Sequence, residues 1–238
     1  TGSLASLSHV FWVDHHKIHT EGIRDVSKID MLFAQQLGYT IKLLGIVKPA
    51  EGRGAQGDGK LPAGVQVSVY PTLIPNAHVL ASVNGVFNAC FVRGDVVGDT
   101  LFYGRGAGKD ATASAVLSDV ADAALDLKGG GKVRVAPFVA HARSGRVVSL
   151  DEITSRYYVR LSVVDRPGVL AKISAIFAAA KIGISSVIQP EGHQGESVPL
   201  ILMLHAAPNA AMRKALARIA KLPVIKGRPI MFRVENLD

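Results

Sequence analysis

The sequence is poor in cysteine and in aromatic residues, and it has no long apolar run. Cys90 is the only cysteine, which excludes an intrachain disulfide and a zinc site built from several thiolates. Its neighbours Ala89 and Phe91 are apolar, so we expect Cys90 to be a buried, unreactive thiol. No stretch approaches the roughly 18 consecutive apolar residues that span a bilayer, and the first residues show no basic segment followed by an apolar one. These absences predict a cytoplasmic protein with no membrane partner.

The net charge is positive, but the positive side chains are not concentrated in one segment. Lys and Arg number 27 against 19 Asp and Glu, which gives a formal net charge of +8. Clustered positive charge attracts nucleic-acid phosphates, but here Lys and Arg are scattered and few aromatic residues lie between them. We therefore expect no nucleic-acid partner. Hydrophobic residues at 48% and charged residues at 19% are typical of a globular protein that buries sizeable cores.

Two segments lack the periodicity of a helix or a strand. Residues 49–64 are rich in glycine and predict a long flexible loop between two strands. Residues 141–155 are polar and aperiodic, which predicts a linker. This linker divides the chain into a first domain at residues 1–140 and a second at residues 156–238.

The first domain is expected to be a mixed or antiparallel sheet with few helices. Ser27 precedes Asp30 by three positions, the spacing of a capping box, and predicts a short helix that ends near Gly38. Apolar or alternating patterns predict strands at residues 41–47, 65–71, 89–93 and 100–103, the last two joined by a turn at 95–99. A helical stripe follows over residues 112–126.

Residues 157–235 alternate between strand and helix patterns. The expected elements are strand 157–164, helix 167–181, strand 184–189, strand 198–205, helix 209–221 and strand 228–234. This βαββαβ order predicts a ferredoxin-like sandwich. For its first helix we expect Asp165 to cap the N-terminus and Pro167 to occupy the first turn.

The segment Val164-Asp-Arg-Pro-Gly-Val-Leu170 resembles the strand-to-helix turn of ACT domains, which bind amino acids beside its glycine. The resemblance implies an effector site at Asp165, Gly168, Val169 and Gln189. Gly168 would let a ligand approach the backbone, and the helix N-terminus would offer N–H groups to a carboxylate. Helix capping alone would explain this turn, and Gln189 could be a solvent-facing strand residue, but the complete βαββαβ order favours an ACT domain.

Residues 4–126 resemble homoserine dehydrogenases in the order and spacing of their motifs. The likeness is carried by Glu21-Gly22-Ile23 and by residues 37–45, 69–75, 78–88 and 102–108. It implies an α+β protein in which a mixed or antiparallel-sheet homoserine dehydrogenase catalytic domain is followed by a ferredoxin-like ACT domain. It also implies an enzyme that interconverts L-aspartate 4-semialdehyde and L-homoserine with NADP or NAD, on the route to threonine and methionine. The expected partners are a second copy of the chain, as a homodimer or higher homo-oligomer, and a feedback effector, for which threonine is the candidate.

The same resemblance implies that the turn at residues 104–108 returns the chain to a nucleotide-binding domain, to which helix 112–126 would belong. The expected cofactor-binding residues are Gly104, Gly106 and Gly108, because a missing side chain lets the backbone approach the cofactor. The catalytic lysine and carboxylates of that family lie before the segment that matches Leu4–Leu7, so no catalytic residue is assigned. We therefore expect a C-terminal part of such an enzyme, inactive alone. A non-catalytic amino-acid-binding regulatory or dimerisation protein is the alternative.

Histidines gather between Trp12 and His19. Two histidines three or four positions apart on a helix can share a zinc ion. The resemblance places this stretch on a strand, where alternation puts His15 and His19 on one face and His16 on the other. We therefore expect no metal site here. The isolated His78 and His141 are expected at the surface.

Overall fold

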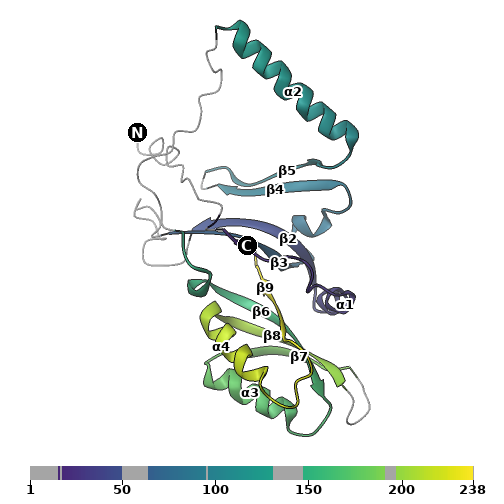
Figure 1. Ribbon diagram of the computed structural model, residues 1–238, viewed down its shortest axis with the longest axis vertical. Coiled ribbons are helices and arrows are strands. Elements are labelled where there is room, and N and C mark those ends of the chain that lie inside the picture. Colours follow the sequence, from purple (N-terminus) through teal and green to yellow (C-terminus); the bar gives the residue numbers. More distant parts are fainter. Residues whose placement is uncertain are drawn as a thin grey trace. The chain divides into compact units, whose positions relative to one another are not determined.

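The computed structural model describes residues 16, 18–49, 64–94, 96–130, 147–190 and 197–237. They belong to two compact units, which are described separately (Figure 1). Most of the predicted loop at 49–64, the start of the predicted linker at 141–155, and His15 and His141 lie outside the described residues. None of the helices in the described ranges is long and apolar enough to cross a membrane.

The smaller unit contains a hairpin and one long helix. Strands β4 (Phe87–Gly94) and β5 (Gly98–Arg105) pair antiparallel after the 3₁₀ turn η2 (Val79–Ser82), and α2 (Lys109–Lys128) follows. The two predicted strands and the helix are therefore confirmed, each longer than expected. The apolar side chains of α2 remain exposed within this unit, among them Val116, Leu117 and Val120.

Two predictions for the smaller unit need correction. Cys90 is exposed rather than buried, because the two-stranded hairpin has no layer over that face within the described part of the unit. His78 is half-buried rather than at the surface, because its ring packs edge-on against Phe91 with the ring centroids 4.9 Å apart. Its Nδ1 also accepts a hydrogen bond from the backbone N–H of Leu80 at 3.2 Å.

The larger unit is built on one seven-stranded mixed sheet. Its strands are β1 (His19–Thr20), β2 (Tyr39–Pro49), β3 (Val65–Pro75), β6 (Thr154–Val164), β7 (Ile184–Ile188), β8 (Ser197–Pro208) and β9 (Ile230–Val234). They lie in the order β1-β3-β9-β6-β8-β7, with β2 also paired to β3. The helices are α1 (Lys28–Gln36), α3 (Val169–Ala179) and α4 (Asn209–Ile219), and a 3₁₀ turn, η3, covers Leu150–Glu152.

The predicted βαββαβ order from β6 to β9 is confirmed, and its strand order β9-β6-β8-β7 is that of a ferredoxin-like sandwich. Helices α3 and α4 cover one face of these strands (Figure 1) and share a core with residues such as Leu161, Ile173 and Ile219. The expected capping by Asp165 is wrong. Helix α3 begins at Val169 with Gly168 as its N-cap, and no side chain caps it.

The other face of the sheet is covered by α1. Phe33 and Ala34 of this helix pack with Tyr158, Met203 and Phe232 of the βαββαβ strands. The predicted capping box is present, since Ser27 and Asp30 hydrogen-bond reciprocally at the start of α1. Residues expected in the first domain therefore complete the core of the second.

Two pairings tie these parts of the sequence together. Strand β3 runs parallel to β9, where Thr72 and Leu73 lie opposite Arg233 and Val234. The compact unit accordingly joins residues 13–76 to residues 145–238. The end of the predicted linker is also regular structure, because Ser149 forms a capping box with Glu152 around η3.

Candidate functional site

A cavity of about 370 Å³ lies at the turn between β6 and α3. It is lined by all four residues predicted for the effector site, Asp165, Gly168, Val169 and Gln189. Gln189, which follows β7, donates a hydrogen bond from Nε2 to Oδ1 of Asp165 at 3.0 Å. The structure thus brings the end of one strand and the residue after another to a single small cavity, as the ACT resemblance implied.

The backbone of this turn is open towards the cavity. Gly168 has φ +84°, a left-handed conformation that favours glycine, and no atom lies within 4 Å of the position a Cβ would take. Because no side chain caps α3, the N–H groups at its first turn are free of side-chain acceptors. Such N–H groups and the helix dipole favour a bound carboxylate.

The rest of the cavity wall was not predicted as site residues. Val163, Val164 and Leu200 supply apolar side chains from β6 and β8, and Arg166 lies at the rim of the turn. In the sequence, only the alternation of side chains along β6 indicates this wall, because alternation sets which side chains face the helices. A volume of this size, with apolar walls and a few convergent polar groups, can hold a small ligand such as an amino acid.

The predicted cofactor-binding glycines lie in the smaller unit, where β5 leads into α2. Gly104 is the penultimate residue of β5 and lies opposite Asn88, whereas Gly108 is the N-cap of α2 with φ +114° and open space beside it. A Cβ at Gly106 would lie 1.6 Å from Nδ2 of Asn88, so a larger residue there would have to displace the exposed Asn88 side chain. Gly104 and Gly108 both have open space beside them, and of these two only Gly108 has a positive φ that favours glycine.

A buried ionic cluster, which the sequence did not predict, lies between β1, β9 and α4 in the larger unit. Arg233 is 1% exposed and donates from Nη1 to both carboxylate oxygens of Glu21, at 3.0 and 3.1 Å. Its Nη2 donates to Oδ1 of Asn209 at 3.1 Å. The guanidinium also lies 4.4 Å from the ring centroid of Tyr70. Burial raises the pKa of Tyr70 and raises that of the neighbouring Tyr157 to about 12.

His19 belongs to this cluster. Its Nε2 lies 2.7 Å from Oε1 of Glu21. Within the described ranges, no group of three or more His, Cys, Asp and Glu side chains is arranged to hold a metal ion.

Comparisons with known proteins agree with both resemblances. A family model described as "Homoserine dehydrogenase" matches residues 3–121, and one described as "ACT domain" matches residues 157–223. Among curated proteins, the homoserine dehydrogenases of Pseudomonas aeruginosa and Neisseria gonorrhoeae are each 35% identical, over 99% and 92% of this chain. The alignments take in 52% and 48% of those proteins, so this chain spans about half the length of the curated relatives it matches.

Solved structures give the same result. A homoserine dehydrogenase from Thiobacillus denitrificans matches 100% of this chain and 52% of its own, with a TM-score of 0.80 and 33% identity. The Staphylococcus aureus homoserine dehydrogenase matches 99% of this chain and 51% of its own, with a TM-score of 0.55 and 28% identity.

Proposed function

Because this chain belongs to the homoserine dehydrogenase family, we propose that it is part of an enzyme that interconverts L-aspartate 4-semialdehyde and L-homoserine with NADP or NAD. We also propose that its ACT domain binds an amino-acid effector. The observation that carries the regulatory part is the cavity at the Gly168 turn, which is lined by four residues selected from the sequence alone.

The cavity offers a separate partner for each part of an amino acid. The uncapped first turn of α3 suits the carboxylate, and Gly168 lets it approach without meeting a side chain. Asp165 and Gln189 supply a carboxylate and an amide for the ammonium group and for a polar side chain. Threonine, with one hydroxyl and one methyl group, matches a wall that is polar on one side and apolar at Val163 and Leu200.

Isothermal titration of the chain with L-threonine tests the effector site, with L-serine, L-methionine and L-homoserine as competitors for specificity. Gly168→Leu should abolish saturable binding, because it fills the cavity. Gly38→Leu is the matched control: Gly38 also has φ +84° with open space around it, but it lies at the end of α1 and not in the cavity. Equal loss in both variants, or no heat with any amino acid, would remove the regulatory part of the proposal.

For the cofactor, we propose that the backbone at Gly104, Gly106 and Gly108 approaches NADP or NAD, which supplies the hydride. The positive φ and the open surroundings of Gly108 fit a close approach of the cofactor. We also propose that the chain functions as a homodimer, because Phe102 and Tyr103 on β5 are 67% and 54% exposed within their unit.

The family resemblance puts proton transfer and homoserine binding on residues outside this sequence. We therefore propose that the pure chain alone does not oxidise NADPH in the presence of aspartate 4-semialdehyde. Detectable turnover would show that its own side chains carry the chemistry. The alternative, a regulatory protein that only binds amino acids, shares the effector site, so these two experiments separate catalysis from regulation.

A further inference from the structure

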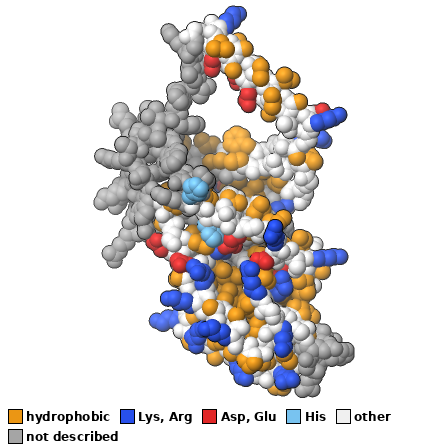
Figure 2. Space-filling model, in the orientation of Figure 1, with side chains coloured by type: hydrophobic (Ala, Val, Ile, Leu, Met, Phe, Trp, Pro, Cys, Tyr) orange, Lys and Arg blue, Asp and Glu red, His pale blue; other side chains and the backbone are white. Residues whose placement is uncertain are grey.

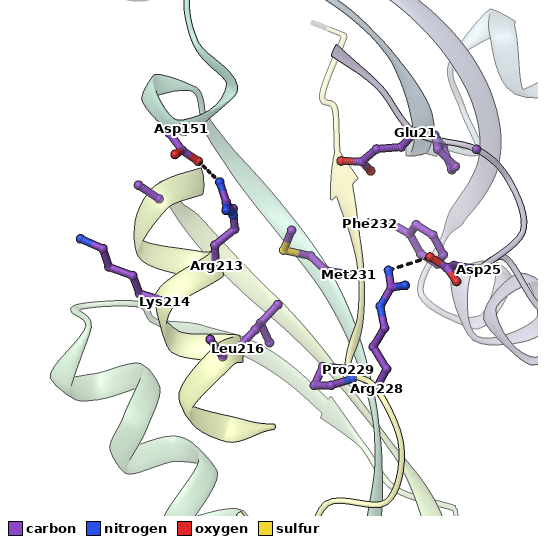
Figure 3. Close-up of a pocket in the computed structure, with 14 residues that line it drawn as sticks. Glu21, Asp25, Asp151, Arg213, Lys214, Leu216, Arg228, Pro229, Met231 and Phe232 are labelled. Carbon is purple, nitrogen blue, oxygen red and sulfur yellow. Dashed lines mark hydrogen bonds and ion pairs between the residues drawn. The ribbon is translucent and has the colours of Figure 1, made fainter. Parts of the chain in front are cut away.

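A second cavity, of about 750 Å³, lies in the larger unit and shares no lining residue with the effector cavity. Helix α4 forms one wall, the segment after β1 forms another, and β9 with the loop before it lies between them (Figure 3). Apolar side chains contribute to the lining, including Leu216, Ala217 and Met231. These apolar side chains form the floor of the cavity. The floor can hold the apolar part of a small molecule.

Three cationic side chains surround this floor. Arg213 and Lys214 come from α4, and Arg228 comes from the loop before β9, with Met231 between them (Figure 3). Lys and Arg side chains gather on the βαββαβ part of the surface (Figure 2). On α4, exposed Lys214 and Arg218 lie four positions apart and therefore on the same side of the helix.

The three carboxylates at the cavity are already paired, and one cation is not. Arg213 Nη1 donates to Asp151 Oδ1 at 2.9 Å, and Arg228 Nη2 donates to Asp25 Oδ2 at 2.8 Å. Glu21 accepts hydrogen bonds from Arg233 at both carboxylate oxygens. Within the described part of the chain, the ammonium of Lys214 forms no hydrogen bond or close ion pair, although its charge adds to the hydrogen bond from Arg213 in lowering the pKa of Asp151. The ammonium of Lys214 and the remaining guanidinium N–H donors of Arg213 are therefore available to a bound anion.

A series of hydrogen bonds links Arg213 to the interior of the protein. Asp151, which fixes Arg213, also accepts a hydrogen bond from Asn209 Nδ2 at 3.3 Å. Asn209 is fully buried and is bound in turn by Arg233. A continuous hydrogen-bonded chain thus runs behind the cavity from Arg213 to Glu21. Side chains fixed in this way lose less conformational entropy when a ligand binds.

We propose that this cavity binds a small organic carboxylate. Its carboxylate is held by Lys214 and by the free N–H groups of Arg213, and its apolar body lies against Leu216 and Met231. The site is separate from the effector turn and goes beyond the proposed function, so its ligand binds independently of an amino acid at Gly168.

The test is an NMR titration of the full 238-residue chain, labelled at the methionine methyl carbons, with 3-phenylpropionate. The chain contains four methionines, of which Met231 alone lines the cavity. We expect a saturable shift of the Met231 signal and none at Met31, which is exposed on α1. The neutral amide, 3-phenylpropionamide, should bind at least tenfold more weakly.

Matched variants separate this site from general charge attraction. Lys214→Gln should weaken 3-phenylpropionate binding at least tenfold, whereas Lys221→Gln, exposed just after the end of α4 and outside the cavity, should change it less than twofold. Gly168→Leu should leave it unchanged, which keeps this result independent of the effector site. Equal losses in both lysine variants, equal affinity for the amide, displacement by an equal concentration of inorganic phosphate, or no saturable shift at Met231 would each overturn the proposal.

Discussion

At the scale of single residues, two adjacent tyrosines on β6 have opposite surroundings. Tyr158 donates from its hydroxyl to Oδ1 of Asp30 at 3.0 Å, on the face covered by α1. Tyr157 points to the other face, and its buried hydroxyl has no hydrogen-bond partner within the described part of the chain. The two hydroxyls therefore contribute differently to stability, although both rings are fully buried.

Removing each hydroxyl in turn measures this difference. Tyr158→Phe should lower the free energy of unfolding by about 1.5–3 kcal/mol, because it removes a hydrogen bond to a carboxylate and leaves Asp30 less satisfied. Tyr157→Phe should be neutral or stabilising by up to about 1 kcal/mol, because it removes a buried polar group that lacks a partner. Urea unfolding of both variants gives the two values, and equal destabilisation would contradict the assigned hydrogen bonds.

The same hydroxyl predicts alkaline sensitivity. Burial is the main cause that raises the pKa of Tyr157 to about 12, above the value of about 10 expected when the chain is unfolded. The folded state then favours the neutral hydroxyl. The contribution of this group to the free energy of unfolding is therefore complete below about pH 10 and is lost as the pH rises through about 12. Wild type should therefore lose stability relative to Tyr157→Phe across this range. Parallel unfolding curves of the two proteins between pH 9 and 12, taken in steps of about half a unit, would show that Tyr157 does not titrate there.

At the scale of elements, α1 is fixed to the sheet by one carboxylate. Asp30 caps its own helix with Ser27, and it also accepts hydrogen bonds from Arg160 Nε at 2.6 Å and Nη2 at 3.1 Å. The Asp30 side chain is fully buried and that of Arg160 is 22% exposed. This ion pair joins residues 130 positions apart in the sequence.

Asp30→Asn should therefore destabilise the chain strongly. We expect a loss of about 3 kcal/mol, the lower end for a broken buried ion pair, because Arg160 keeps some contact with water. Asp25→Asn, five positions earlier, breaks the exposed pair with Arg228 and should cost less than about 1 kcal/mol. Thermal unfolding monitored by circular dichroism compares the two variants, and similar losses would show that burial of Asp30 is not the deciding factor.

These elements also show what the sequence can predict. The Ser27 and Asp30 capping box and the βαββαβ order were predicted because both depend on short-range spacing. The partnership of Asp30 with Arg160 and the pairing of β3 with β9 were not, since they depend on the register of distant strands. The residues proposed for the effector site share a local motif and line one cavity, whereas the Arg233 cluster has no local signature because its members come from four separate segments.

At the scale of the whole molecule, the ACT strands share one sheet and one core with residues 13–76. A protein limited to residues 145–238 would lose α1 and uncover apolar side chains such as Ile201, Met203 and Phe232. We expect it to melt at a lower temperature than the full chain and to bind a hydrophobic dye or self-associate. A melting temperature equal to that of the full chain, with no dye binding, would show that the ACT strands fold without this packing.

An amide NMR titration of the full chain with L-threonine tests the proposed effector site most directly. We expect the largest shifts on residues 165–170 and on Gln189, which line the effector cavity, and we expect them to disappear in Gly168→Leu. The Gly38→Leu control should keep them, because it has the same backbone conformation outside the cavity. Shifts centred elsewhere, or none at saturating threonine, would contradict the assignment of this turn as the regulatory site.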